Sequence, residues 1–87
     1  MAADRLSVTV ISPERKVYEG EADQVVAPAW DGEVGILRNH APFVVLLGEG
    51  DLRIRRGVAE ERIFVSGGFL QVADNVVTVL SERTAAV

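Results

Sequence analysis

The residue types that could support catalysis or metal binding are few in this sequence. His40 is the only histidine, and there is no cysteine. A zinc site or a catalytic triad needs several such groups in contact, so the composition disfavours catalysis by His40. Asn39 is suited to open a turn, and Pro42 favours an extended conformation for Ala41. We therefore interpret residues 38–42 as a rigid loop before the next strand, which could also contact a partner.

Asp31 and Glu33 are the second candidate for chemistry, as a carboxylate pair for acid–base catalysis. With Trp30 as a flat platform, the same two side chains could instead hydrogen-bond a saccharide or another small ligand. The simpler interpretation is a hairpin turn at Asp31-Gly32, because glycine accepts the positive φ that such turns need. Glu33 would then be a solvated strand residue. A hydrolase that uses His40 with Asp31 or Glu33 would lose its activity in a His40→Ala variant.

The glycines and arginines offer two weaker signals. No glycine-rich segment fits a phosphate-binding loop, and we expect neither a cofactor nor a metal ion. Gly67-Gly68 predicts a turn or a bulge. Arg53, Arg55 and Arg56 could form a small basic patch that recognises carboxylates, or a charged strand edge that prevents aggregation.

Composition bounds the class of protein. The 87 residues carry a net charge of -4 and are 48% hydrophobic, which predicts one domain over residues 1–87 with a mostly aliphatic core and frayed ends at 1–5 and 83–87. The negative charge disfavours a nucleic-acid partner. No apolar run is long enough to cross a membrane, and the N-terminus lacks a signal-peptide pattern. We expect a cytoplasmic protein that could still sit on a membrane complex.

The elements that must position these residues are short strands. "LSVTVIS" and "DLRIRR" alternate apolar and polar residues, which is typical of half-buried strands. Residues 16–29 predict one strand broken near Gly20 and another at 24–27, with Pro28 at an edge or bulge. "RIFVS", "FLQVA" and "VVTVLSE" predict a meander joined by Gly67-Gly68 and Asp74-Asn75. Turns at regular spacing indicate an all-β sandwich or barrel.

Three ordered segments resemble one family. "DGEVGIL" followed by "NHAP", then "GDLRI", then "SGGFLQVADNVVTVL" are similar to the N-terminal sandwich of the epsilon subunit of bacterial F-type ATP synthase, over residues 6–82. The resemblance implies a flattened antiparallel sandwich of about ten short strands. It also implies a non-catalytic rotor subunit that couples the membrane c ring to the gamma subunit and the catalytic head during proton-driven ATP synthesis, at the cytoplasmic face of the bacterial plasma membrane.

The resemblance also implies which residues meet partners. The positions that match the gamma-facing side are Ser12, His40 and Pro42. The positions that match the rim facing the loops of the c ring, which usually carry an arginine in this family, are Asp31, Gly32 and Glu33. An apolar patch on one sheet should dock on gamma, and exposed residues within 25–30 and 43–47 are candidates unless they pack in the core. We expect no direct membrane insertion.

Two departures from the family pattern qualify this expectation. Many relatives have proline where this chain has Arg38, so the loop is expected to be less stiff or to place a charge toward gamma. Most relatives also continue as a helical hairpin that inhibits ATP hydrolysis and in some members binds ATP. Because this sequence ends at Val87, we expect those two functions to be absent from it.

Overall fold

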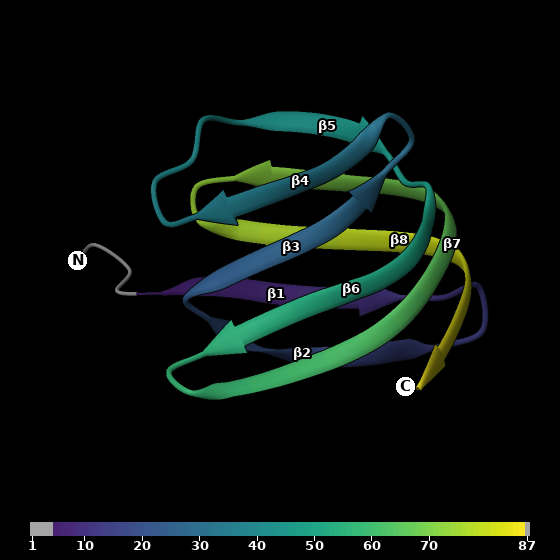
Figure 1. Cartoon of the computed structure of the whole chain (residues 1–87), viewed down its shortest axis with the longest axis horizontal. Coiled ribbons are helices and arrows are strands. Elements are labelled where there is room, and N and C mark those ends of the chain that lie inside the picture. The colour runs from purple at the N-terminus through teal and green to yellow at the C-terminus, as the bar shows by residue number, and fades with distance from the viewer. Residues whose placement is uncertain (1–4, 87) are drawn as a thin grey trace.

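The computed structural model describes residues 5–86 and shows an all-β fold (Figure 1). No helix that could span a membrane occurs within this described part. The eight strands are β1 (Leu6–Ile11), β2 (Lys16–Ala22), β3 (Gln24–Ala29), β4 (Gly32–Leu37), β5 (Phe43–Leu46), β6 (Glu49–Arg56), β7 (Ala59–Ala73) and β8 (Val76–Ala86).

All strands join one sheet, in the order β2-β1-β8-β7-β6-β3-β4, with β5 paired separately to β7. Every pair is antiparallel except β1 with β8, which is parallel. The expected purely antiparallel sandwich therefore needs a correction at this pair. A parallel pair requires a long crossover connection, and here the whole chain between the first and last strands supplies it.

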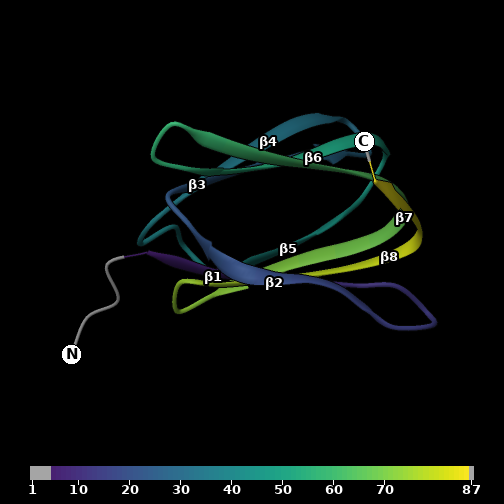
Figure 2. The ribbon, with the colours of Figure 1, turned by 90° about the horizontal axis from the view of Figure 1, so that it is seen from below.

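The sheet folds over itself into two layers (Figure 2). One layer holds β3, β4, β6 and the first part of β7, and the other holds β1, β2, β5 and the first part of β8. β7 and β8 have 15 and 11 residues and belong to both layers. Counting each of these two twice turns the eight strands into the ten segments expected of the family sandwich.

The bend of β7 between the layers lies at Gly67-Gly68, whose φ angles are 72° and 97°. A Cβ atom on Gly68 would overlap the backbone carbonyl oxygen of Leu80. The strand continues through this bend without reversing, so the meander predicted here is wrong and the bulge interpretation fits better. Across the bend, the buried Ser81 hydroxyl accepts from the Ser66 N–H at 3.2 Å and donates to the Arg83 carbonyl at 2.7 Å.

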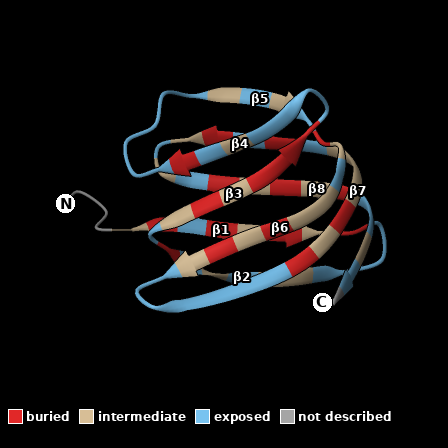
Figure 3. Cartoon of the chain, viewed as in Figure 1, coloured by how far each residue is buried: buried red, intermediate tan, exposed pale blue. Residues whose placement is uncertain are grey.

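The core lies between the two layers and is aliphatic, as expected (Figure 3). The alternation of "LSVTVIS" and "DLRIRR" predicts the buried side correctly, and only Tyr18 and Phe43 among the aromatic residues pack against the core from its margin. The largest fully buried side chains are Leu6, Ile36, Leu52, Ile54, Leu70, Val8, Val10, Val25, Val65, Val72, Val77 and Val79.

The predicted turn at Asp74-Asn75 is confirmed, and the predicted turn at Asp31-Gly32 is shifted by one residue. Asp74 and Asn75 both have positive φ, 53° and 63°, which fits a two-residue hairpin turn. The β3–β4 turn consists of Trp30 and Asp31, and Gly32 begins β4 with φ 133°, one residue earlier than predicted. The predicted break near Gly20 is wrong, because β2 runs without interruption to Ala22.

Two smaller expectations concern strand ends. Pairing of β3 with β6 stops at Val26, so Pro28 needs no N–H on that side and occupies the predicted edge position. Of the ends expected to fray, Arg83–Ala86 continue β8 and pair with β7 residues 63–66. Residues 1–4 and 87 lie outside the described part of the chain.

Candidate functional site

The outer face of the layer that holds β1, β5, β7 and β8 carries a row of apolar side chains. Leu46 pairs with Phe69, Phe69 with Leu80, and Leu80 with Ile11. Each has at least one buried chain neighbour (Leu47, Leu70, Val79 and Val10), so these four point outward; Leu46 is 62% exposed and Phe69 36%. With strands about 4.8 Å apart, this apolar strip is roughly 14 Å long.

A depression of about 360 Å³ includes three residues of the apolar strip, Ile11, Phe69 and Leu80, and continues beside them along β7 and β8. Its floor is mostly apolar, and Val44 adds a further exposed side chain one row along β5. Contiguous exposed apolar surface on a small protein is typical of an interaction site. The depression is lined by Ile11, Ser12, Pro13, Gly68, Phe69, Leu80, Ser81 and Glu82.

Ser12 shapes this depression through the backbone. It is only 9% exposed. Its hydroxyl donates to the Arg15 carbonyl at 3.2 Å, accepts from the Arg15 N–H at 3.3 Å, and its own N–H donates to the same carbonyl at 2.9 Å. These bonds hold the turn between β1 and β2, so Ser12 supports the end of the apolar strip, and its hydroxyl is already engaged.

The loop at residues 38–42 is held by a reciprocal pair of asparagines. The Asn39 N–H donates to Asn75 Oδ1 at 2.6 Å, and Asn75 Nδ2 donates to Asn39 Oδ1 at 3.3 Å. Asn39 has φ 63°, a conformation that asparagine tolerates better than most residues. His40 Nδ1 lies 2.8 Å from the Ala41 carbonyl oxygen, and its ring lies 4.8 Å from that of Phe43. The loop is therefore tied to the β7–β8 turn, as the rigid-loop interpretation predicts.

The candidate gamma-facing residues lie at opposite ends of one face. Phe43 stands level with Val77 of β8, and Ile11 stands level with Leu80. Pro42 precedes Phe43, and Ser12 follows Ile11. Measured along β8, Pro42 and Ser12 are therefore five strand positions, or roughly 17 Å, apart. The apolar strip occupies the Ser12 end, and His40 and Pro42 occupy the other.

His40 is also far from the carboxylates of the β3–β4 hairpin. All six residues of β4 lie between Asp31 and the His40 loop, and Glu33 is four strand positions from Leu37 at its end, which are strand lengths of roughly 17 and 13 Å. An acid–base pair needs hydrogen-bond contact, so the hydrolase interpretation of His40 with Asp31 or Glu33 is wrong. Groups of three or more potential metal ligands are absent from residues 5–86.

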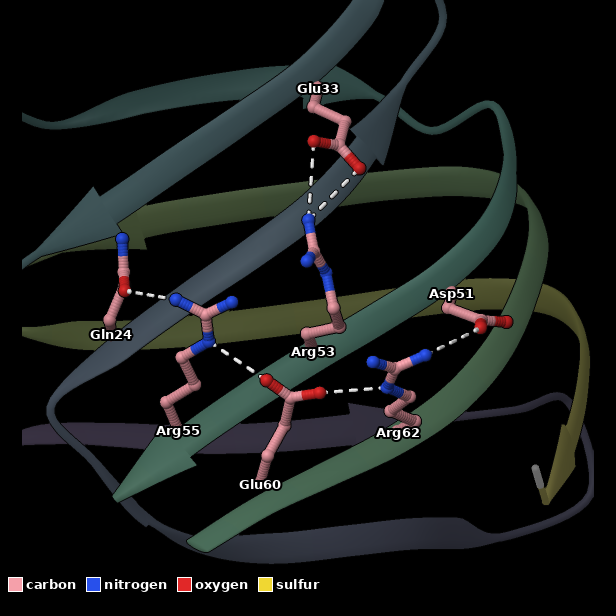
Figure 4. A network of polar contacts seen from close by, with 7 residues as sticks. All are labelled: Gln24, Glu33, Asp51, Arg53, Arg55, Glu60 and Arg62. Atoms are coloured by element: carbon pink, nitrogen blue, oxygen red, sulfur yellow. Dashed lines mark hydrogen bonds and ion pairs between the residues drawn. The ribbon is translucent and has the colours of Figure 1, made fainter. Parts of the chain in front are cut away.

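The outer face of the other layer is charged rather than apolar (Figure 4). Arg53 Nη2 donates to both carboxylate oxygens of Glu33, at 3.2 and 3.1 Å. Arg53 lies directly opposite Arg62 on β7. Each of these two arginines pairs with a different carboxylate, Arg53 with Glu33 and Arg62 with Glu60. Arg53 therefore engages Glu33, one of the two acidic residues that the resemblance assigns to the c-ring contact.

Glu60 joins two arginines on the same face. Its Oε1 accepts from Arg55 Nε at 2.8 Å and its Oε2 from Arg62 Nε at 2.7 Å. These bonds, chiefly that from Arg62, lower the pKa of Glu60 below its ordinary value, and Glu60 in turn raises the pKa of Arg62. Asp51 lies 4.0 Å from Arg62, and Gln24 accepts from Arg55 at 3.2 Å.

Neither interpretation of the arginines of β6 holds. Arg53 and Arg55 alternate with carboxylates instead of forming a basic patch. β6 lies between β3 and β7 in the sheet, so these residues do not protect a strand edge. They stabilise a charged outer face, and Arg56 takes no part in the network of Figure 4.

The predicted ring-facing residues lie together at the tip of the β3–β4 hairpin. Asp31, Gly32 and Glu33 are all exposed. Glu33 is committed to Arg53, whereas the Asp31 carboxylate has no hydrogen bond or ion pair within residues 5–86. Trp30, beside Asp31, is 67% exposed, and its N–H donates to the Leu46 carbonyl at 3.0 Å. The hairpin tip thus adjoins the end of the apolar strip.

Sequence reasoning found part of the apolar strip. Leu46 falls within the candidate segment 43–47, whereas most of segment 25–30 is buried, as the core alternative states. Ile11, Phe69 and Leu80 were not proposed. Ile11 and Leu80 each lie between two buried residues, which is a usable signal, but the alignment of all three in one row depends on strand register.

Several ATP synthase epsilon chains are similar in sequence to nearly the whole of this chain. The sequence model of the ATP synthase delta/epsilon chain β-sandwich domain matches residues 5–87. An ATP synthase epsilon chain of Leptospira borgpetersenii is 49% identical over 98% of this chain and 67% of its own length. One of Maridesulfovibrio salexigens is 46% identical over 92% of this chain and 56% of its own length. The chain therefore spans roughly half to two thirds of these relatives.

Solved structures share the fold. A chain in the cryo-EM structure of the Euglena gracilis mitochondrial ATP synthase, comprising OSCP, F1 and c-ring, matches with TM-score 0.89 at 21% identity, over 99% of this chain and 56% of that chain. A chain of the Tetrahymena thermophila mitochondrial ATP synthase central stalk and c-ring matches with TM-score 0.76 at 18% identity, over 99% and 69%. With the match over residues 5–87 and the epsilon chains above, the conclusion is that this chain belongs to the ATP synthase epsilon chain family and forms its β-sandwich domain.

Proposed function

We propose that this protein is a non-catalytic rotor subunit that links gamma to the c ring, at the cytoplasmic face of the bacterial plasma membrane, during proton-driven ATP synthesis. Family membership supports a role in ATP synthase. One outer face of the sandwich carries the apolar strip and the other is charged, which supports docking of gamma on the apolar face alone. A folded-over sheet with an aliphatic core suits torque transfer, because close-packed interiors deform little.

The observation that carries this proposal is the apolar strip. Leu46, Phe69, Leu80 and Ile11 come from four strands and form one outward row, in which Leu46 and Phe69 are exposed and Leu80 and Ile11 are half-buried. An apolar patch of this kind suits the buried core of an interface, which is more apolar than its rim. Gamma docks on this row and on the depression beside it. Ser12 supports one end of the docking face, and His40 and Pro42 form its other end.

The hairpin tip is the second contact of the proposal. The loops of the c ring are contacted by Asp31, Gly32 and Glu33. Asp31 directly follows Trp30, whose N–H is bonded to Leu46 at the end of the apolar strip. The exposure of Asp31, Gly32 and Glu33 at a tight turn allows a polar rim contact, which contributes orientation more than affinity. No nucleotide or metal ion takes part in either contact.

Calorimetric titration of this chain into the cognate gamma subunit tests the docking face. We expect saturable one-to-one binding that weakens at least tenfold in Leu46→Asn, since full burial of a leucine side chain contributes about 1.5–3 kcal/mol and tenfold in affinity is about 1.4 kcal/mol. Val58→Asn is the matched control, because Val58 is fully exposed at the β6–β7 turn of the opposite layer. Equal affinity for Leu46→Asn and Val58→Asn would refute the assigned face.

The alternative of a free-standing sandwich that binds a small ligand at Trp30, Asp31 and Glu33 finds less support. Its main hydrogen-bonding group, the Glu33 carboxylate, is held by Arg53 at 3.1 and 3.2 Å. A ligand would have to displace this guanidinium before it could bind Glu33. Family membership over the whole matched segment also favours the stalk role.

A further inference from the structure

His40 has an unused polar group at one end of the proposed docking face. Its Nδ1 lies 2.8 Å from the Ala41 carbonyl oxygen, which can only accept a hydrogen bond, so Nδ1 carries the proton. A neutral imidazole holds one ring proton, and Nε2 is therefore left with a lone pair. The side chain is exposed, and Nε2 has no hydrogen-bond partner within residues 5–86. Ser12, by contrast, already uses its hydroxyl within its own turn.

The residues around His40 hold its ring in this orientation. A residue that precedes proline is restricted to extended conformations, so Pro42 fixes the direction of the Ala41 carbonyl that the ring contacts. The His40 N–H donates to the Leu37 carbonyl at 3.3 Å, and the centroid of its ring lies 4.8 Å from that of Phe43 at an interplanar angle of 48°. Because the ring is oriented before any partner binds, binding through Nε2 costs little conformational entropy.

Asn75 anchors this loop from the β7–β8 turn, 36 positions away in the sequence. Its Oδ1 accepts from the Asn39 N–H at 2.6 Å, and its Nδ2 donates to Asn39 Oδ1 at 3.3 Å. Asn39 directly precedes His40 and has φ 63°, a left-handed conformation that these two bonds stabilise. Asn75 thus acts on His40 through Asn39, which makes it a positioning residue.

We propose that His40 presents Nε2 as a hydrogen-bond acceptor to a donor group on gamma, and that Asn75 positions it through Asn39. This inference rests on the proposed function, in which His40 and Pro42 form one end of the docking face. It names the chemistry of the partner group. An N–H or O–H group of gamma can bond to the Nε2 lone pair, whereas a carbonyl or carboxylate oxygen placed there is repelled by it.

The test uses the fact that His40 is the only histidine. The chain is labelled with nitrogen-15 histidine, and long-range proton–nitrogen spectra of the neutral ring are recorded for the chain alone and with unlabelled gamma. We expect a protonated Nδ1 and an unprotonated Nε2 in both spectra, with the Nε2 resonance shifted when gamma binds. A ring protonated at Nε2 in either spectrum would overturn the inference, as would an Nε2 resonance that bound gamma leaves unchanged. A folded wild-type chain that does not bind gamma would refute the proposed function and, with it, the partner assigned to Nε2.

Two variants of His40 separate the acceptor from the bulk of the side chain. His40→Leu keeps a side chain of similar size and removes the acceptor, whereas the amide oxygen of His40→Gln can occupy the position of Nε2. We expect His40→Leu to weaken gamma binding about two- to twelvefold, the range for one hydrogen bond, and His40→Gln to stay within about twofold of wild type. Equal affinities of the two variants for gamma would overturn the acceptor role.

The positioning role of Asn75 is tested against its neighbour in the same turn. Asn75→Gly and Asp74→Gly both place a residue that accepts the positive φ, but only Asn75→Gly removes the bonds to Asn39. We expect faster amide exchange at Asn39 and at least about twofold weaker gamma binding in Asn75→Gly alone. Asn75→Asp should restore both, because its carboxylate still accepts from the Asn39 N–H. Equal effects of Asn75→Gly and Asp74→Gly, or faster exchange with unchanged gamma affinity, would overturn the positioning role.

Discussion

The bend at Gly68 gives the sharpest test of the fold, through the variant Gly68→Ala. Gly68 has φ 97°, outside the left-handed region that alanine tolerates. The new Cβ would also overlap the Leu80 carbonyl oxygen and crowd Ser81 Cα. An unfavourable φ costs about 1–3 kcal/mol, and displacement of the Leu80 backbone should bring the loss to about 3–4 kcal/mol. A domain of this size has a total stability of roughly 4–13 kcal/mol.

Gly57→Ala is the matched control for this variant. Gly57 also has a positive φ, 60°, but nothing lies within 4 Å of its added Cβ. Its loss should be only about 1–2 kcal/mol, the cost of the left-handed conformation alone. Urea unfolding followed by circular dichroism measures both. Equal destabilisation of the two variants would refute the claim that β7 and β8 approach too closely at the bend to admit a side chain.

Three further predictions concern polar groups. Arg62 lowers the pKa of Glu60, so the stabilisation from this carboxylate is present above its unfolded pKa and is lost as the pH falls through its folded pKa. The stability difference between wild type and Glu60→Gln should therefore shrink on acidification below about pH 4.5. A difference that does not depend on pH would contradict this. Asn75→Gly retains the positive φ but removes both bonds to Asn39, and should cost about 1–2 kcal/mol in thermal unfolding; no loss would argue against the tie. Ser81→Ala removes the buried hydroxyl that bonds the Ser66 N–H and the Arg83 carbonyl and should cost about 1–3 kcal/mol in urea unfolding; unchanged stability would argue against a role of these bonds in holding the bend.

The alternation of the sequence predicts most of the fold, since a strand with one buried face must alternate. Leu6, Val8 and Val10 are buried as the pattern of "LSVTVIS" requires. The bend at Gly67-Gly68 could not be distinguished from a turn, because both need glycine at positive φ. What decides between them is the pairing of each half of β7 with a different strand, β6 or β5, which is a long-range property.

The candidate site was predicted unevenly for the same reason. The positions of Asp31 and Glu33 at a hairpin followed from local turn chemistry. The ion pair of Glu33 with Arg53 depends on the pairing of β3 with both β4 and β6, and no local pattern contains it. The apolar strip depends on three strand registers at once, so each member looked like an ordinary strand residue in the sequence.

Coupling in the assembled enzyme tests whether gamma docks on the apolar strip. Membrane vesicles whose ATP synthase has been stripped of epsilon are supplied with this chain, and proton pumping per ATP hydrolysed is measured. We expect the wild-type chain and Val58→Asn to restore pumping and Leu46→Asn to fail to do so at the same concentration. Full restoration by Leu46→Asn, or no restoration by a wild-type chain that binds gamma, would contradict this expectation.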